Sequence, residues 1–263
     1  MEYIKALLLG IVQGFTEFLP VSSSGHLVLV QHFLKTVNIF DMSFDVFVHL
    51  GSLIAVIIFF RKEIFVLLQS LVYLKRPEYK QQRLICLWLF MATIITGFFG
   101  LILKVYYESF KNPLFVAIML SVTGFILFFS DLLRTSHLES SQLTMKKSLF
   151  IGIGQSIAII PGISRSGTTI FFSLLTGLDR KNAASFSFLL SIPAILGANL
   201  SDFKTLISLE SDMLVMYMIA FLAAFISGFC VIKWLIEIVK KAKLKYFAYY
   251  CWMISAVSFI FMN

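Results

Sequence analysis

The chain has few charged residues, few prolines and few cysteines. Asp, Glu, Lys and Arg make up 14% of its 263 residues, whereas 59% are hydrophobic and the mean hydropathy is +0.91. A soluble domain usually has about 25% charged residues, so this composition excludes an ordinary soluble fold. The three cysteines lie inside apolar stretches without CxxC spacing, and such buried thiols pack as small hydrophobic side chains. We therefore assign them no redox or metal chemistry.

Long uncharged stretches dominate the sequence instead. Five of them have 18 or more residues, which is enough to cross a hydrocarbon core of about 30 Å. A sixth, Met42–Phe60, is nearly as apolar but contains Asp45 and His49. Two shorter stretches, Tyr3–Val12 and Ser148–Ile160, fit re-entrant helices better than spans. The five long stretches are Leu84–Leu103, Pro113–Ser130, Ala184–Ser201, Met213–Ile232 and Tyr246–Asn263. The pattern predicts an all-α integral membrane protein with about six transmembrane helices and two re-entrant helical hairpins.

Lys and Arg give the chain a formal net charge of +8, and their distribution follows a membrane topology. Segments rich in these residues alternate with segments that hold only one or two. The rich segments are Arg61–Arg83, Arg134–Lys147, Arg180–Lys181 and Lys240–Lys245. The positive-inside rule places them in the cytoplasm and favours membrane anchoring over nucleic-acid binding. On this topology the hairpin at residues 1–35 enters from outside and the one at residues 148–177 enters from the cytoplasm.

An internal repeat is visible at an offset of 142 residues. Residues 10–25 and 152–167 share six identities in sixteen aligned positions. Opposite entry directions of the two hairpins are what an inverted-topology repeat requires, with the two unwound loops meeting near the midplane. We expect a single membrane domain over residues 1–263, with repeat one at about 1–130 and repeat two at about 143–263. The identities are Gly10/Gly152, Ile11/Ile153, Gln13/Gln155, Ser22/Ser164, Ser24/Ser166 and Gly25/Gly167.

Two polar loops interrupt the apolar sequence, FLPVSSSGH at Phe18–His26 and IPGISRSGTT at Ile160–Thr169. Each contains a proline, which ends a helix, and we expect new helices to begin at about Leu27 and about Thr169. Free N–H groups at helix N-termini bind anions, so two such termini that face each other predict a phosphate-type site. The predicted substrate-binding residues are Gln13, Ser22, Ser24, Gly25, Ser164, Ser166, Gly167 and Thr169.

Arg165 and Glu17 are the ionisable residues that decide the chemistry of these loops. Ionisable groups at membrane depth are functional hypotheses by default, and a guanidinium binds phosphate at two points. The alternative for Arg165 is a structural ion pair with Glu17. Gln13 lies one helical turn before Glu17, and we predict that these two side chains bind a divalent cation, Mg²⁺ or Ca²⁺, together with substrate phosphates.

Two histidines receive different predictions. His26 follows Ser23 by three residues and is a candidate general base for a hydroxyl or a water; a capping or packing role is the alternative. His49 lies within a predicted span beside Gly51 and Ser52, where we expect a packed, hydrogen-bonded side chain.

Three segments resemble the undecaprenyl-diphosphate phosphatase family, the bacitracin-resistance proteins of bacterial inner membranes. They are QGFTEFLPVSSSGH at Gln13–His26, FDVFVHLGSLIAV at Phe44–Val56 and PGISRSGTT at Pro161–Thr169, and the resemblance covers essentially the whole chain. It implies hydrolysis of the terminal phosphate of the C55 isoprenoid diphosphate, which recycles the lipid carrier of cell-wall synthesis. Bacitracin resistance is implied too, because that antibiotic binds the diphosphate form.

The resemblance also implies roles for single residues. The family's acidic motif falls on Gln13 and Glu17, with Gln13 at a position where many members have Glu. Its proposed serine nucleophile falls on Ser23, its histidine on His26 and its phosphate-binding arginine on Arg165. The active site is then expected to open toward the periplasmic or outer face of the inner membrane.

A second function class stays open at this stage. Inverted re-entrant repeats are transporter architecture, so a lipid-carrier flippase or a small-anion transporter is the alternative to a phosphatase. The placement of acid and histidine in one half and arginine in the other favours catalysis. We expect the prenyl diphosphate lipid and membrane lipids as partners and no nucleic acid; the oligomeric state stays open, with a homodimer among the alternatives.

Overall fold

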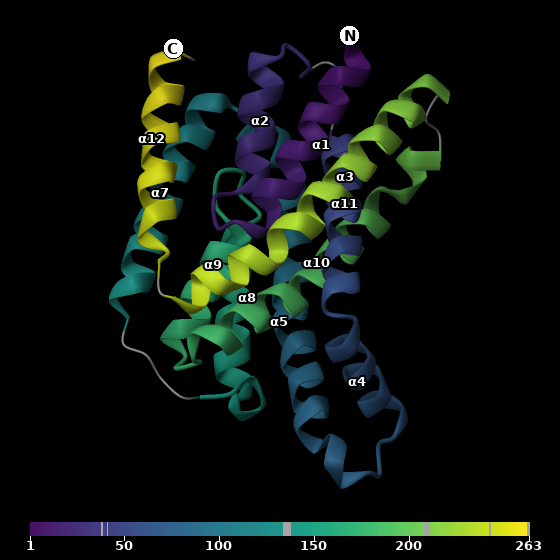
Figure 1. Cartoon of the computed structure of the whole chain (residues 1–263), viewed down its shortest axis with the longest axis vertical. Coiled ribbons are helices and arrows are strands. Elements are labelled where there is room, and N and C mark those ends of the chain that lie inside the picture. The colour runs from purple at the N-terminus through teal and green to yellow at the C-terminus, as the bar shows by residue number, and fades with distance from the viewer. Residues whose placement is uncertain (38, 41, 134–137, 208–210, 242, 262–263) are drawn as a thin grey trace.

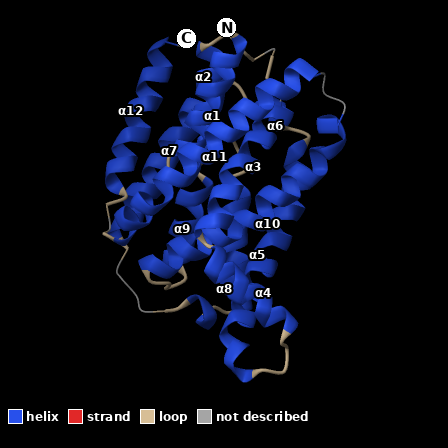
Figure 2. Ribbon diagram, turned by 45° about the vertical axis from the view of Figure 1, so that its right-hand side comes forward, coloured by secondary structure: helices blue, strands red, loops and turns tan. Residues whose placement is uncertain are grey.

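The computed structural model describes residues 1–37, 39–40, 42–133, 138–207, 211–241 and 243–261, and these ranges are predominantly helical. Both chain ends lie at one end of the helical bundle, and the turn between α4 and α5 lies at the other (Figure 1). Short loops connect most helices (Figure 2). The α-helices are α1 (Glu2–Phe18), α2 (Ser23–Phe33), α3 (Met42–Phe59), α4 (Arg61–Val72), α5 (Lys80–Lys104), α6 (Tyr107–Phe110), α7 (Pro113–Leu132), α8 (Met145–Ile157), α9 (Arg165–Leu175), α10 (Arg180–Ile207), α11 (Ser211–Lys240) and α12 (Lys245–Phe261).

Four helical segments in the described ranges are long and apolar enough to cross a membrane. A fifth is added if α3 and α4, which meet at a bend of 80°, form one span. The sequence predicted about six; α12, the C-terminal candidate, has only 17 residues. The four segments are Pro77–Leu103, Pro113–Leu132, Arg180–Leu200 and Asp212–Val239. The helices therefore fit a multi-pass membrane protein, as the composition predicted.

One helix lies where the sequence suggested a polar connection. Residues 61–83 were expected to connect two spans, but α4 forms at their start. Ile64, Leu67, Leu68 and Leu71 recur at helical spacing there, which is the pattern of an amphipathic helix. The basic residues of this segment lie in the first turn of α4, in the turn between α4 and α5, and at the start of α5.

Two equivalent glycines bring helices into close contact. A Cβ on Gly10 of α1 would lie 2.2 Å from the carbonyl oxygen of Ala220 in α11. A Cβ on Gly152 of α8 would lie 2.7 Å from the carbonyl oxygen of Ala92 in α5. Gly10 and Gly152 are aligned in the sequence repeat, so α1 packs on α11 in the way that α8 packs on α5.

The loops after α1 and α8 begin their next helices with the same cap. The Ser22 hydroxyl accepts a hydrogen bond from the Gly25 amide at 3.2 Å, and the Ser164 hydroxyl accepts one from the Gly167 amide at 3.1 Å. Serine is a preferred N-cap because its oxygen satisfies an amide that has no partner in the first turn. Helices α2 and α9 therefore begin at Ser23 and Arg165, about four residues before the positions expected from the sequence.

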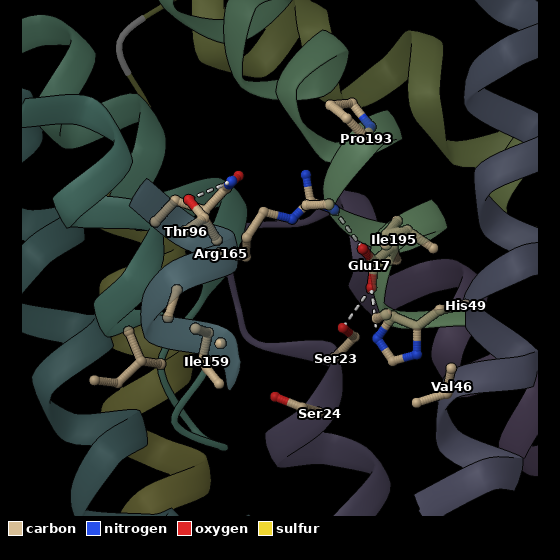
Figure 3. Close-up of a pocket in the computed structure, with 18 of the residues that line it drawn as sticks. Glu17, Ser23, Ser24, Val46, His49, Thr96, Ile159, Arg165, Pro193 and Ile195 are labelled. Carbon is tan, nitrogen blue, oxygen red and sulfur yellow. Dashed lines mark hydrogen bonds and ion pairs between the residues drawn. The ribbon is translucent and has the colours of Figure 1, made fainter. Parts of the chain in front are cut away.

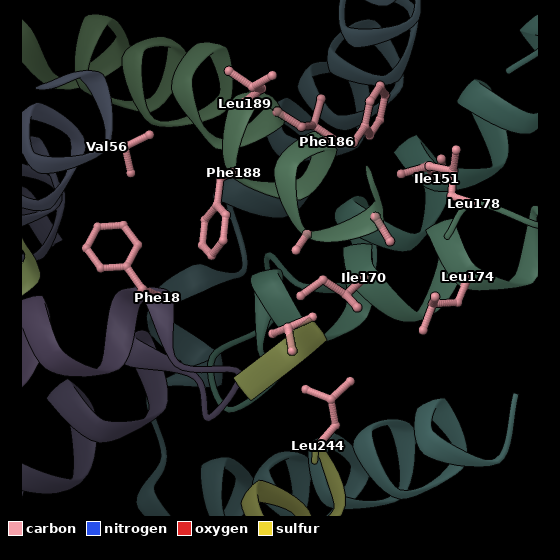
Figure 4. Close-up of a cluster of buried hydrophobic side chains, with 14 of the residues drawn as sticks. Phe18, Val56, Ile151, Ile170, Leu174, Leu178, Phe186, Phe188, Leu189 and Leu244 are labelled. Atoms are coloured by element: carbon pink, nitrogen blue, oxygen red, sulfur yellow. The ribbon is translucent and has the colours of Figure 1, made fainter. Parts of the chain in front are cut away.

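An apolar cluster supports the first of these loops. Phe18, the last residue of α1, meets Phe188 of α10 edge to face, with ring centroids 6.1 Å apart. Both side chains are buried, as is Val56 of α3 (Figure 4). Because Phe18 follows Glu17 directly, this packing fixes the end of α1 from which the Glu17 side chain extends.

Candidate active site

A cavity of about 490 Å³ lies where the two capped loops meet. Its wall includes residues from α1, α2, α3, α5, α8, α9 and α10. Figure 3 shows Arg165 reaching across the cavity to Glu17, with Ser23 and His49 beside Glu17 and Thr96 on the opposite side. Residues from both halves of the chain thus form one polar centre.

Glu17 is the acceptor at this centre, and its side chain is 4% exposed. Oε2 accepts from the Ser23 hydroxyl at 2.6 Å and from Gln13 Nε2 at 2.9 Å, and it lies 3.3 Å from His49 Nε2. Oε1 accepts from Nη2 of Arg165. An ionised carboxylate has about four lone-pair positions; Ser23, Gln13 and Arg165 occupy three of them, and the His49 ring lies beside Oε2.

Arg165 is the first residue of α9 and brings the positive charge into the cavity. Besides Glu17, it donates from Nη1 to the carbonyl oxygen of Ser187 at 3.4 Å. The Ser187 hydroxyl pairs with that of Thr169 at 2.5 Å, and Thr169 also donates to the Arg165 carbonyl at 2.8 Å. Thr169 and Ser187 therefore tie the start of α9 to α10 and orient the arginine.

The sequence-predicted residues divide into two groups. One group lines the cavity, and the other stands behind its wall. The lining residues are Glu17, Ser22, Ser23, Ser24, Ser164 and Arg165. The residues behind the wall are Gln13, Gly25, His26, Ser166, Gly167 and Thr169. The second group contributes through supporting contacts: Gln13 orients Glu17, the two glycine amides complete the caps, and the Ser166 hydroxyl donates to the carbonyl oxygen of Leu19 at 3.3 Å.

His26 points away from Ser23. Its Nδ1 is 2.8 Å from the carbonyl oxygen of Ser22, and its Nε2 is 2.9 Å from the Tyr250 hydroxyl. The two rings are also stacked, 5.6 Å between centroids. These contacts correspond to the packing alternative of the sequence analysis, and the role of His26 as a base remains a prediction that they do not support.

His49 is the functional candidate that sequence reasoning missed. Its Nδ1 bonds to the carbonyl oxygen of Asp45 at 2.5 Å, as expected of a packed histidine, but Nε2 faces Glu17 and the ring lines the cavity. The available signal was an ionisable side chain within an apolar span. His49 shares this feature with Arg165.

Comparison with known proteins agrees with this geometry. A family model described as bacitracin resistance protein BacA matches residues 6–257. The chain belongs to this family. A curated relative from Methanobrevibacter smithii, named undecaprenyl-diphosphatase, is 43% identical over 272 residues, covering 99% of this chain and 98% of the relative. A relative of the same name from Halothermothrix orenii is 41% identical, covering 99% and 98%. Undecaprenyl-diphosphatase 1 from Shouchella clausii is 39% identical, covering 100% and 98%.

A divalent cation fits the predicted pair Glu17 and Gln13 poorly in this BacA family member. Oε2 of Glu17 already accepts from Ser23 and Gln13, Oε1 pairs with Arg165, and Gln13, whose Oε1 is buried without a hydrogen-bond partner, does not line the cavity. Within the described part of the chain, no group of three or more His, Cys, Asp or Glu side chains could bind a metal ion. We derive no reaction step through a cation.

Proposed function

We propose that this protein hydrolyses undecaprenyl diphosphate to undecaprenyl phosphate and inorganic phosphate. The observation that carries the proposal is the 2.6 Å hydrogen bond from the Ser23 hydroxyl to Glu17, beside Arg165 in the cavity. A hydroxyl bonded to a carboxylate and next to a guanidinium suits phosphoryl transfer, where positioning and charge stabilisation carry most of the catalysis. The name of the relatives, undecaprenyl-diphosphatase, supports undecaprenyl diphosphate as the substrate.

The contacts suggest a two-step reaction. Ser23 Oγ attacks the terminal phosphorus, its proton passes to Glu17, and the bond to the bridging oxygen breaks so that undecaprenyl phosphate leaves. A water then attacks the phosphoserine, Ser23 Oγ takes back the proton from Glu17, and inorganic phosphate leaves. Arg165 stabilises the charge on the phosphoryl oxygens in both steps, and the N-termini of α2 and α9 add their positive dipole ends.

The equivalent caps and glycine contacts support a finer proposal about architecture. We propose that the chain is an inverted-topology repeat in a bacterial inner membrane, whose two helical hairpins enter from opposite faces. The distribution of Lys and Arg supports a site that opens toward the periplasmic face. There the enzyme would recycle the cell-wall lipid carrier and confer bacitracin resistance by removing the diphosphate that bacitracin binds.

Phosphate release tests the proposal. Purified protein in detergent is mixed with undecaprenyl diphosphate, and inorganic phosphate is measured with and without EDTA, which also tests the predicted need for Mg²⁺ or Ca²⁺. Hydrolysis needs no sealed compartment, whereas transport does. Vesicle uptake without phosphate release, with divalent cation present, would establish the flippase or anion-transporter alternative. Size-exclusion chromatography with light scattering determines the oligomeric state, which the sequence leaves open, in the same preparation.

A further inference from the structure

Three glycines on one side of the cavity differ from the other glycines that the structure describes. A Cβ on Gly97 or Gly197 would meet no atom within 4 Å, and one on Gly100 would meet only Ile159 Cδ1, at 3.7 Å. At the other ten glycines whose surroundings are described, the nearest atom would lie at 2.0–3.1 Å. Glycine weakens a helix interior, and at these three positions close packing does not require it. Open space of the cavity therefore lies beside these three positions.

The three glycines face the same cavity from two helices. Gly97 and Gly100 are on α5, one turn apart, and Gly197 is on α10, one turn after Pro193; all of them line the cavity. Their apolar neighbours in the wall are Leu101 on α5 and Ala194 and Ile195 on α10, and the polar lining residues of these two helices are Thr93, Thr96 and Asn199. We call Gly97, Gly100 and Gly197 the glycine wall. Its surface suits an apolar chain and offers no hydrogen bonds to a phosphate.

Two buried amides point to a ligand in the same cavity. Gln155 is 2% exposed; its Nε2 donates to Thr96 Oγ1 at 3.0 Å, and its Oε1 has no partner. Asn199 is 7% exposed; its Nδ2 donates to the carbonyl oxygen of Ile195 at 2.9 Å, and its Oδ1 has no partner. Buried acceptors without donors are rare and costly. Both side chains line the cavity, so waters around a charged headgroup can supply the missing donors.

The cavity thus combines a charged end with an apolar wall. Glu17, Ser23 and Arg165 form the charged end, and the glycine wall lies on α5 and α10. A volume of about 490 Å³ falls in the range of about 300–1,000 Å³ that encloses a drug-sized ligand, which is more than a diphosphate alone needs. We propose that the glycine wall binds the first isoprene units of the substrate, so that Gly97, Gly100 and Gly197 determine specificity for a prenyl tail. This inference rests on the proposed function.

Substitutions of increasing size at Gly97 and Gly197 test the proposal. The first measurement is KM for C15 and C55 prenyl diphosphates; the second is the inhibition constant of methylenediphosphonate, which reports binding at the charged end alone. Gly197→Leu and Gly97→Leu should raise KM for both lipids about tenfold or more, because each methylene displaced from apolar contact weakens binding roughly fourfold. The inhibition constant should stay within about twofold of wild type, a difference too small to indicate a lost contact.

Gly97→Ala and Gly197→Ala should raise KM less than leucine does, since an added Cβ alone meets open space at both positions. Ile94→Phe on α5 and Leu200→Phe on α10 are the matched controls, because both side chains are exposed and neither lines the cavity; they should keep KM near wild type. Unchanged KM in the leucine variants would overturn the proposal, and so would an inhibition constant that rises as much as KM.

A prenyl phosphate with a diazirine on its first isoprene unit gives a readout without catalysis. It should crosslink to peptides of α5 and α10 whether or not the wild-type protein hydrolyses prenyl diphosphates. Crosslinking without any hydrolysis would contradict the proposed function and leave the glycine wall in place. Crosslinks confined to other helices would contradict the role of the glycine wall and leave the proposed function intact.

Discussion

Arg165 and Glu17 lie 148 residues apart in the sequence and form one ion pair between the start of α9 and the end of α1. The pair joins the two polar loops, and both residues line the cavity. A guanidinium has five N–H donors in a fixed plane, so Arg165 can keep its contact with Glu17 and still bind a phosphate. The structural pair and the phosphate-binding role, which are alternatives at the level of sequence, are therefore compatible.

Breaking this pair should cost both stability and activity. Arg165→Met leaves Glu17 as an unpaired buried charge, and Glu17→Gln leaves Arg165 unpaired; losing one partner of a buried pair costs about 3 kcal/mol. We expect each single variant to unfold at lower temperature and to release no phosphate. The double variant should recover most of the lost stability, because no unpaired charge remains, and should stay inactive. Thermal unfolding in detergent and phosphate release are the measurements. Wild-type turnover in either single variant would contradict the role given to the pair.

Ser23→Ala should abolish hydrolysis and the formation of a phosphoserine. The substitution removes the hydroxyl that donates to Glu17 at 2.6 Å and leaves the cap at Ser22 in place. Quenched reactions with ³²P-labelled substrate should trap label on wild-type protein and none on the variant.

Ser24→Ala is the control for this experiment. Ser24 also lines the cavity, and its hydroxyl interacts with that of Ser22 at 3.4 Å. This variant should retain the trapped label and most of the turnover. Near-normal turnover of Ser23→Ala would instead assign the attack to a water.

His49→Ala should reduce kcat about tenfold, the effect of losing about 1.5 kcal/mol from one contact to a charged group, because it removes the ring that lies 3.3 Å from the Glu17 carboxylate. Tyr250→Phe tests the other histidine: it deletes the partner of His26 Nε2 and keeps the stacked ring. We expect a loss of about 1 kcal/mol of stability, the usual worth of one hydrogen bond, with most activity kept. Steady-state kinetics and thermal unfolding separate the two. A larger kinetic effect in Tyr250→Phe than in His49→Ala would return the catalytic role to His26.

Gly10→Leu and Gly152→Leu should prevent stable folding. A Cβ at either position collides with backbone of α11 or α5, which cannot move as a flexible side chain could. Overpacked interiors typically lose about 1–3 kcal/mol, occasionally more, and two helices must separate here. Size-exclusion profiles after expression should show aggregated protein. Gly97→Ala, on the helix that Gly152 contacts, should give a normal profile; a normal profile for Gly10→Leu would contradict the observed packing.

Most of the fold class was predictable because membrane insertion depends on the composition of each segment taken alone. Uncharged stretches of sufficient length identified the helices α5, α7, α10 and α11. Helix starts were predicted less well. The first turns of α2 and α9 are rich in Ser and Gly, which single-residue preferences place outside helices, and only the cap geometry at Ser22 and Ser164 shows that the helices begin there.

The site was predicted in part for a similar reason. Arg165, Glu17 and Ser23 were identifiable because polar residues in apolar sequence are conspicuous. The directions in which the histidine side chains point could not be predicted from the sequence. His26 is next to the serines in sequence, yet its ring turns toward Tyr250, while His49 reaches Glu17 from α3.

By itself, the sequence determined that this chain is a helical membrane protein with two polar loops, an arginine within one of them and a BacA-type motif set, because hydropathy and motif spacing are properties of the chain alone. The tertiary structure decided which polar groups meet. Glu17 gains contacts from α2, α3 and α9. The glycines of α5 and α10 leave open space beside the cavity, and His26 contacts α12. Each of these depends on how helices distant in sequence pack together, since helix packing sets the distances over which hydrogen bonds and ion pairs form.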